Sequence, residues 1–181
     1  INSLNGDGLH RMFYYCKFFN QDINTKVCVI GGYTDDPYMA WDIGNSGVNT
    51  LVFTFRAAEA FNQNLNGWDT SKITNFKQVF YGALNFNNGV NTTTMTWDTS
   101  SATTIREIFK YAREFNKDIN TRTVVVGAET KTYWDTSKVT DMGGAFLNAE
   151  KFNQYIGDWD TSKVTNMVQT FYNARVFNQN I

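Results

Sequence analysis

Four Asp-Thr-Ser triplets are the parts of this 181-residue chain whose residue types and spacing most resemble a chemical site. Each follows a tryptophan, and the aspartates are Asp69, Asp98, Asp135 and Asp160. A carboxylate beside two hydroxyls could bind a cation or, paired with a second carboxylate, hydrolyse a glycan. The serines Ser100, Ser137 and Ser162 have no nearby base, and the single histidine, His10, has no partner motif. A Ser-His-Asp arrangement is therefore not predicted.

The triplets recur because the chain is built from a repeat. The segments "FNQNLNGWDTSKITNFKQVFYGALNF" from Phe61 and "FNQYIGDWDTSKVTNMVQTFYNARVF" from Phe152 share fifteen letters at identical offsets, and each ends at the start of the next unit, 25 residues on. Aspartate in such a turn usually caps its own backbone. We therefore predict turn-capping carboxylates, and we expect no enzyme, no catalytic residue, no cofactor and no metal site.

Large aromatic residues occupy fixed positions of the unit. All five tryptophans share one position of the unit. The motif F-x-x-A-x-x-F-N, which ends in a Phe-Asn pair, also recurs in every unit. Two phenylalanines and one tryptophan per unit form a continuous core only when units stack. The predicted structural core contains Trp41, Trp68, Trp97, Trp134, Trp159, Phe80, Phe109, Phe146 and Phe171. The asparagine of each Phe-Asn pair is expected to form a polar ladder between units.

The periodicity predicts a stack of α/β coils. Val164, Met167, Phe171 and Ala174 have the spacing of one helix face, and residues 154–156 suggest a short strand. We therefore expect a parallel solenoid of about six coils, with one short helix and one short strand per coil. It forms a single domain over residues 1–181 and is expected to be a segment of a longer array. The coils start near Phe19, Phe61, Phe86, Phe115, Phe152 and Phe177.

Two long insertions enter at the same corner of the unit. "TKVCVIGGYT" and "TRTVVVGAET" both carry β-branched residues before a glycine turn, which predicts a hairpin in each. Because an isolated hairpin is marginal in water, each should pack on the coils or pair with another chain. The candidate interaction residues are Val27, Val29, Ile30, Tyr33, Tyr38, Val124, Val125, Val126 and Tyr133.

Two further features concern covalent chemistry. Cys16 replaces the alanine of its motif, which suggests a small buried residue, and Cys28 lies in the first insertion. Both a Cys16–Cys28 disulfide and two free thiols are compatible with the sequence. Asn91 begins the sequon Asn-Thr-Thr and is a possible glycosylation site in an exported eukaryotic protein.

The full unit F-x-x-A-x-x-F-N-Q-x-I-x-x-W-D-T-S-K-V-T-N-M resembles the repeat of 25 or 26 residues found in bacterial surface proteins and lipoproteins, notably of Mycoplasma and Listeria. It is also similar to the Bacteroides surface-protein type of leucine-rich repeat. The resemblance implies a leucine-rich-repeat-like solenoid displayed outside the cell, with no catalytic residues to transfer. The insertions and the segment "WDIGNSGVNTL" depart from this pattern.

Composition narrows the class of partner. Sixteen basic and seventeen acidic residues leave a net charge of −1, which argues against nucleic-acid partners. No apolar run suggests a membrane span. We expect a non-enzymatic extracellular structural protein that makes protein contacts, by self-association or with neighbouring coils, as in a surface fibre or appendage. The alternative is an adhesin for a host glycan or protein, and a more remote one is a glycan-active enzyme.

Overall fold

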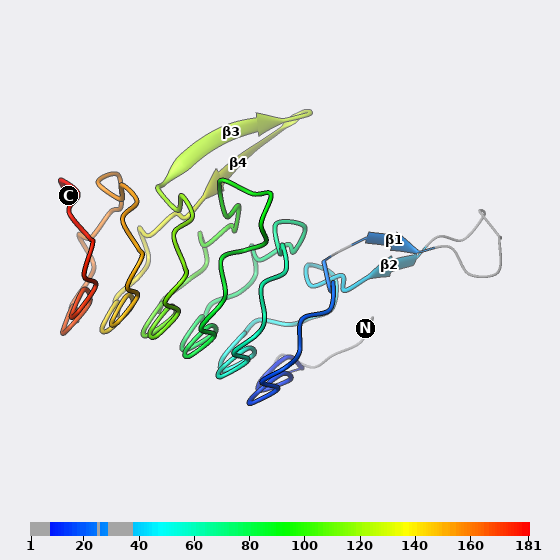
Figure 1. The fold of residues 1–181 in the computed structure, drawn as a ribbon. Helices are drawn as coiled ribbons and strands as arrows, with labels where there is room; N and C mark the ends of the chain where they lie inside the picture. Colours follow the sequence, from blue (N-terminus) through cyan, green and yellow to red (C-terminus); the bar gives the residue numbers. More distant parts are fainter. Residues whose placement is uncertain (1–7, 25, 29–37) are drawn as a thin grey trace.

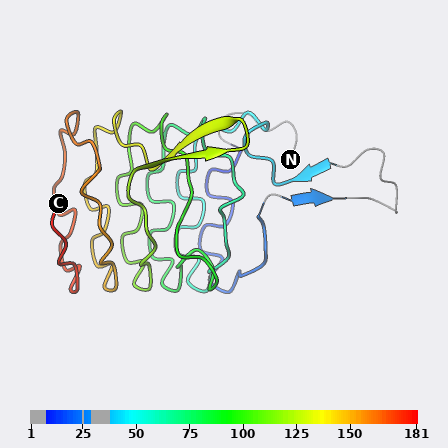
Figure 2. The same cartoon turned by 90° about the horizontal axis from the view of Figure 1, so that it is seen from above.

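The computed structural model describes residues 8–24, 26–28 and 38–181, and these form a row of stacked irregular coils (Figure 1). The coils lie side by side along one axis, from the first near the N-terminus to the last at the C-terminus. Seen from above, successive coils run parallel to one another (Figure 2). Single parallel bridges join them at equivalent residues, which are Thr50, Asn75, Thr104, Asp141 and Asn166.

All four named strands belong to the two insertions. β1 (Lys26–Cys28) pairs with β2 (Tyr38–Ala40), and β3 (Arg122–Val126) pairs with β4 (Glu129–Tyr133), both antiparallel. The second insertion therefore forms the hairpin that its sequence predicts. In the first insertion two strands pair antiparallel, and the glycine turn predicted at Gly31-Gly32 lies outside the described residues. The coils themselves contain no named strand among the described residues.

The F-x-x-A-x-x-F motif forms consecutive turns. In the copy of the motif that begins at Phe55, the Ala58 N–H donates to the Phe55 carbonyl at 3.0 Å, and the Phe61 N–H donates to the Ala58 carbonyl at 3.1 Å. The third residue of the first turn, Ala57, has φ of 57°, which is typical of a type II turn. A positive φ is incompatible with a right-handed helix.

Two other backbone donors of this segment bond to the next coil. The Phe55 N–H donates to the Val79 carbonyl at 2.9 Å, and the Ala57 N–H donates to the Tyr81 carbonyl at 2.7 Å. In a helix every backbone N–H would donate to the carbonyl four residues earlier, and none would be left for the neighbouring coil. The coil backbone thus alternates between turn bonds and inter-coil bonds.

The predicted leucine-rich-repeat-like α/β solenoid is therefore wrong. No helix occurs in the described part of the chain, and the segment 154–156 is not a strand. The error has a physical cause: side chains at the corners of successive turns point inward every three or four residues, and an amphipathic helix has the same spacing. The spacing located the inward residues but did not distinguish the two backbones.

Stacked aromatic columns fill the interior. Phe55, Phe80, Phe109, Phe146 and Phe171 form one column, in which neighbouring ring centroids are 5.5 to 5.7 Å apart. The tryptophans stack in two groups, Trp41–Trp68–Trp97 and Trp134–Trp159. Each of the last four donates its indole N–H to a carbonyl of the preceding coil at 2.6 to 3.1 Å. Of the predicted core residues, only Trp41 and Phe171 are half-buried, and the rest are buried. Full burial of each ring contributes roughly 1.5 to 3 kcal/mol.

Asparagine side chains join the coils along a second line. Each Oδ1 accepts the backbone N–H of the equivalent asparagine in the next coil at 2.8 to 2.9 Å, through Asn20, Asn62, Asn87, Asn116, Asn153 and Asn178. The predicted polar ladder is confirmed. Cys16, in contrast, is an exposed free thiol, so its predicted burial is wrong. It lies in the first described coil, which has only one neighbouring coil among the described residues.

Candidate interaction site at the second hairpin

The β3–β4 hairpin leaves the coils between Ile119 and Trp134 and lies over their upper edge (Figures 1 and 2). Its base is fixed, because the Thr121 hydroxyl donates to the Trp134 carbonyl at 2.6 Å and the Arg122 guanidinium pairs with Asp118 at 2.9 Å. The Trp134 N–H in turn donates to the Trp97 carbonyl at 2.9 Å. The hairpin is thus connected directly to the tryptophan position of the repeat.

The tip of the hairpin is apolar and exposed. Val125 is 75% exposed and Val126 is 48% exposed, whereas Val124 is half-buried. The two strands meet at Gly127, whose φ of 64° suits a tight hairpin turn. Among the described strands, β3 and β4 pair only with each other, so each has a partner on one side. Exposed apolar residues on a free strand edge are a feature that soluble proteins usually avoid.

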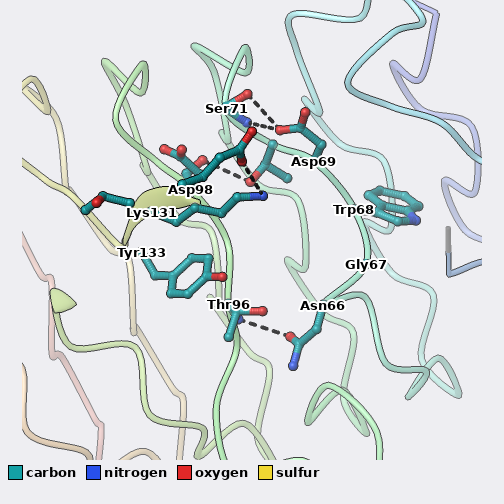
Figure 3. A pocket seen from close by; sticks show the side chains of 12 residues that line it. Asn66, Gly67, Trp68, Asp69, Ser71, Thr96, Asp98, Lys131 and Tyr133 are labelled. Carbon is teal, nitrogen blue, oxygen red and sulfur yellow. Dashed lines mark hydrogen bonds and ion pairs between the residues drawn. The ribbon is translucent and has the colours of Figure 1, made fainter. Parts of the chain in front are cut away.

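A groove of about 380 Å³ lies between β4 and the coils (Figure 3). Its hairpin side is formed by Tyr133, Lys131, Thr130 and Glu129, and no β3 residue lines it. The opposite side is formed by two successive coils, at residues 66–71 and at Thr96 and Asp98. β4 therefore faces the coils, and β3 is the outer strand.

The groove is acidic. Asp69 and Asp98 face it from equivalent positions of neighbouring coils, and each uses one carboxylate oxygen to accept the N–H of the serine two residues on, at 3.0 and 2.9 Å. Glu129 adds a third carboxylate, and Lys131 is the only basic residue in the lining, with its ammonium 3.6 Å from Glu129. Electrostatics therefore disfavours an anionic ligand here.

The sequence contains a signal for this groove that pattern reading missed. The unit normally has a lysine after Asp-Thr-Ser, as at Lys72, but the coil of Asp98 has Ser101 in that position. The hairpin inserted one coil later supplies Lys131 to the same region. A missing lysine in one coil and an added lysine in the following insertion are the detectable signature.

The family model described as "Mycoplasma protein of unknown function, DUF285" matches residues 33–132 and 127–181. The chain belongs to the DUF285 family. The two matched segments meet inside the β3–β4 hairpin and together span the stacked coils from the first insertion onward. The coarse resemblance to a Mycoplasma-type family is thus confirmed. No curated protein and no solved structure matches the chain.

In this DUF285 chain the Asp-Thr-Ser triplets cap turns. Ser162 donates its backbone N–H to Asp160 at 2.9 Å, and hydrogen bonds from the Ser162 side chain and backbone hold the pKa of Asp160 below its usual value. The threonine joins coils, since the Thr136 hydroxyl donates to the Asp160 carbonyl at 3.0 Å. The predicted role of the aspartates is confirmed. Among the described residues, no group of three potential metal-ligating side chains is found.

The other candidate residues are dispersed. Val27 lies in β1 and Tyr38 in β2, while Val29, Ile30 and Tyr33 lie outside the described residues. Asn91 is exposed on a turn, where a glycan would have room. His10 is exposed and lies 5.6 Å from the ring of Phe53, without a carboxylate or nucleophile in contact with it in any interaction described. Within the described ranges, no helix is long and apolar enough to cross a membrane.

A second, smaller cavity of about 230 Å³ lies where two glycines interrupt the outer surface of the DUF285 coils. Gly143 and Gly144 stand where other coils carry larger side chains such as Arg106 and Glu107. Burial raises the pKa of Glu107, but hydrogen bonds from Lys110 and Gln78 outweigh it and lower the pKa overall. Glu107 is thus an ionised, structurally bonded carboxylate rather than a proton donor.

Proposed function

We propose that this chain is a non-enzymatic, extracellular structural repeat protein that makes protein–protein contacts through the β3–β4 hairpin. The observation that carries the proposal is the exposed apolar edge of this hairpin, with Val125 at 75% exposure on a strand that has a free side. Edges of this kind add a strand from another chain. The resemblance of the unit to the 25- or 26-residue repeats of Mycoplasma and Listeria surface proteins supports an extracellular location.

The polar residues of the unit support a structural role. The aspartate and threonine of the triplets and the asparagine of the Phe-Asn pair make turn or inter-coil hydrogen bonds. Each such bond contributes about 1 kcal/mol to stability. A residue that holds the fold in every coil is poorly placed for a reaction confined to one coil.

Removal of the hairpin tests the proposal, and the chain itself supplies a design. Leu65 and Trp68 occupy the same positions of the unit as Ile119 and Trp134, but only Asn66 and Gly67 lie between them. Replacing residues 121–133 by one glycine copies this short join and retains Asn120, which bonds to Asp158 in the next coil. Sedimentation velocity of the 181-residue chain over a range of concentrations should show self-association, and the shortened variant should remain monomeric.

The matched control keeps the hairpin and replaces its most exposed valine by a charged residue. Val125→Lys should reduce self-association without changing the circular dichroism spectrum, since lysine protects a strand edge. A chain that is monomeric at every concentration, or a shortened variant that associates as strongly as the parent, would contradict the proposal.

A second candidate function, an adhesin for a host glycan, is favoured by the groove beneath β4. Tyr133 offers an aromatic ring, and Asn66, Thr96 and Asp98 offer polar groups around it (Figure 3). The acidic lining argues for neutral or amino sugars. Screening against a panel of immobilised oligosaccharides should then show binding that Asp98→Asn abolishes and Asp160→Asn, at the equivalent position outside the groove, leaves intact. Equal loss in both variants would assign the effect to the turn rather than to the groove.

A further inference from the structure

The outer edge of β3 is the best-defined contact surface of the hairpin. β4 lies toward the coils and lines the groove, so its free side is partly covered, whereas β3 lies on the far side (Figure 1). Between Thr123 and Val126 the outer strand has no charged residue, while β4 carries Glu129 and Lys131. Charged side chains protect β4 from pairing, and β3 lacks that protection.

The backbone of β3 has hydrogen-bonding groups directed outward at alternate residues. The register pairs Val126 with Glu129 across the two-residue Gly127-Ala128 turn. The pair that closes such a turn is hydrogen-bonded, so Val126, Val124 and Arg122 direct their backbone groups toward β4. Thr123 and Val125 then direct theirs away from the sheet.

We infer that β3 pairs antiparallel with β3 of a second copy of this chain, about a two-fold axis at Val124. In this register Thr123 of each strand lies opposite Val125 of the other, so the outward backbone groups meet and two hydrogen-bonded pairs form. Val124 lies opposite its own symmetry mate as a non-hydrogen-bonded pair. The inference rests on the proposed function and specifies its partner and geometry.

Charge supports this occupant over an unrelated strand. The only charged residue of β3 is Arg122, which lies opposite Val126 of the second copy and is already paired with Asp118 at 2.9 Å. No like charges meet, because Val124 and Val125 lie opposite uncharged residues of the other strand and Val126 lies opposite Arg122. The result is a four-stranded sheet, which is independently stable where a lone hairpin is marginal.

The pairing is expected to be weak. Two five-residue edges bury much less than the roughly 1,200 Å² that stable complexes need, so the dimer should form in a concentration-dependent manner. A covalent trap therefore gives the clearest test.

Symmetric cross-linking distinguishes this geometry from others. In a Cys16→Ser, Cys28→Ser background, Val124→Cys places two thiols opposite one another at a non-hydrogen-bonded pair, where the Cα separation suits a disulfide. Mild oxidation of the full chain should convert most of it to a disulfide dimer. Val168→Cys, which is exposed on a coil distant from the hairpin in sequence, should give only slow collisional dimers.

The outcomes separate the inference from the proposed function. Efficient Val124→Cys dimers that Val125→Lys suppresses would support β3 pairing. Self-association of the unmodified background with no preference of Val124→Cys over Val168→Cys would overturn β3 pairing and leave the proposed function standing. Absence of any self-association would overturn both.

Discussion

Replacing Asn116 by alanine should weaken the contact between two coils by a predictable amount. The Asn116 Oδ1 accepts the backbone N–H of Asn153 and the side-chain amide of Gln154, both at 2.9 Å. Alanine leaves the Asn153 N–H without its acceptor, while the Gln154 amide keeps the Asn116 carbonyl at 3.2 Å. Losing two partly buried bonds worth about 1 kcal/mol each should lower the free energy of unfolding by about 2 kcal/mol.

Asn178 provides the matched control because it occupies the same motif position in the last coil. Its own N–H is bonded to Asn153, but its side chain accepts no bond described in this structure. Asn178→Ala should therefore change stability by less than about 0.5 kcal/mol. Urea unfolding followed by tryptophan fluorescence should show a lower midpoint with an unchanged slope for Asn116→Ala only. Equal effects of the two substitutions would refute the ladder as a source of stability.

Two further predictions concern backbone strain and pH. Gln169 has φ of 58° and Val168 precedes it in the same exposed turn, so Gln169→Gly should be nearly neutral, whereas Val168→Gly should lower the free energy of unfolding by about 1 kcal/mol in thermal melts. If Val168→Gly were the milder change, strain at Gln169 would be excluded. The lowered pKa of Glu107 means that its stabilising bonds with Lys110 and Gln78 are present above its usual pKa of 4.5 and are lost as pH falls through the folded-state pKa. Melting temperatures measured from about pH 6 to about pH 3 should therefore fall less steeply for Glu107→Gln than for the parent chain, and parallel curves would contradict this assignment.

Repetition made the side-chain roles predictable. Each position of the unit recurs several times, so the tryptophan as a core residue, the Phe-Asn asparagine as a ladder and the aspartate as a turn cap could all be read from sequence. The β3–β4 hairpin was predictable as well, because its β-branched run and glycine turn interrupt the unit. These features depend on the residue type and on the residues adjacent in sequence, both of which can be read directly from the sequence.

The coil backbone was not predictable from the same pattern. Residues such as Gln78 and Tyr111 adopt a positive φ that their side chains do not favour, and their N–H groups bond to the next coil. That conformation is stabilised by contacts with the neighbouring coil, so local residue propensities do not predict it. The groove depended on a similarly non-local event, since Lys131 and Asp98 line the same groove only after the hairpin folds back over the preceding coils.

The stacking of the tryptophan rings has an optical consequence. Trp41 and Trp68 have ring centroids 6.5 Å apart, Trp68 and Trp97 are 6.4 Å apart, and Trp134 and Trp159 are 6.2 Å apart, all nearly parallel. Indoles this close couple their electronic transitions, so the absorption and emission of each of these two groups are shared among its tryptophans. A small change in the separation of two coils alters the spectrum even when no indole reaches solvent. The protein thus contains its own reporter of coil spacing, which can be read in solution without a label.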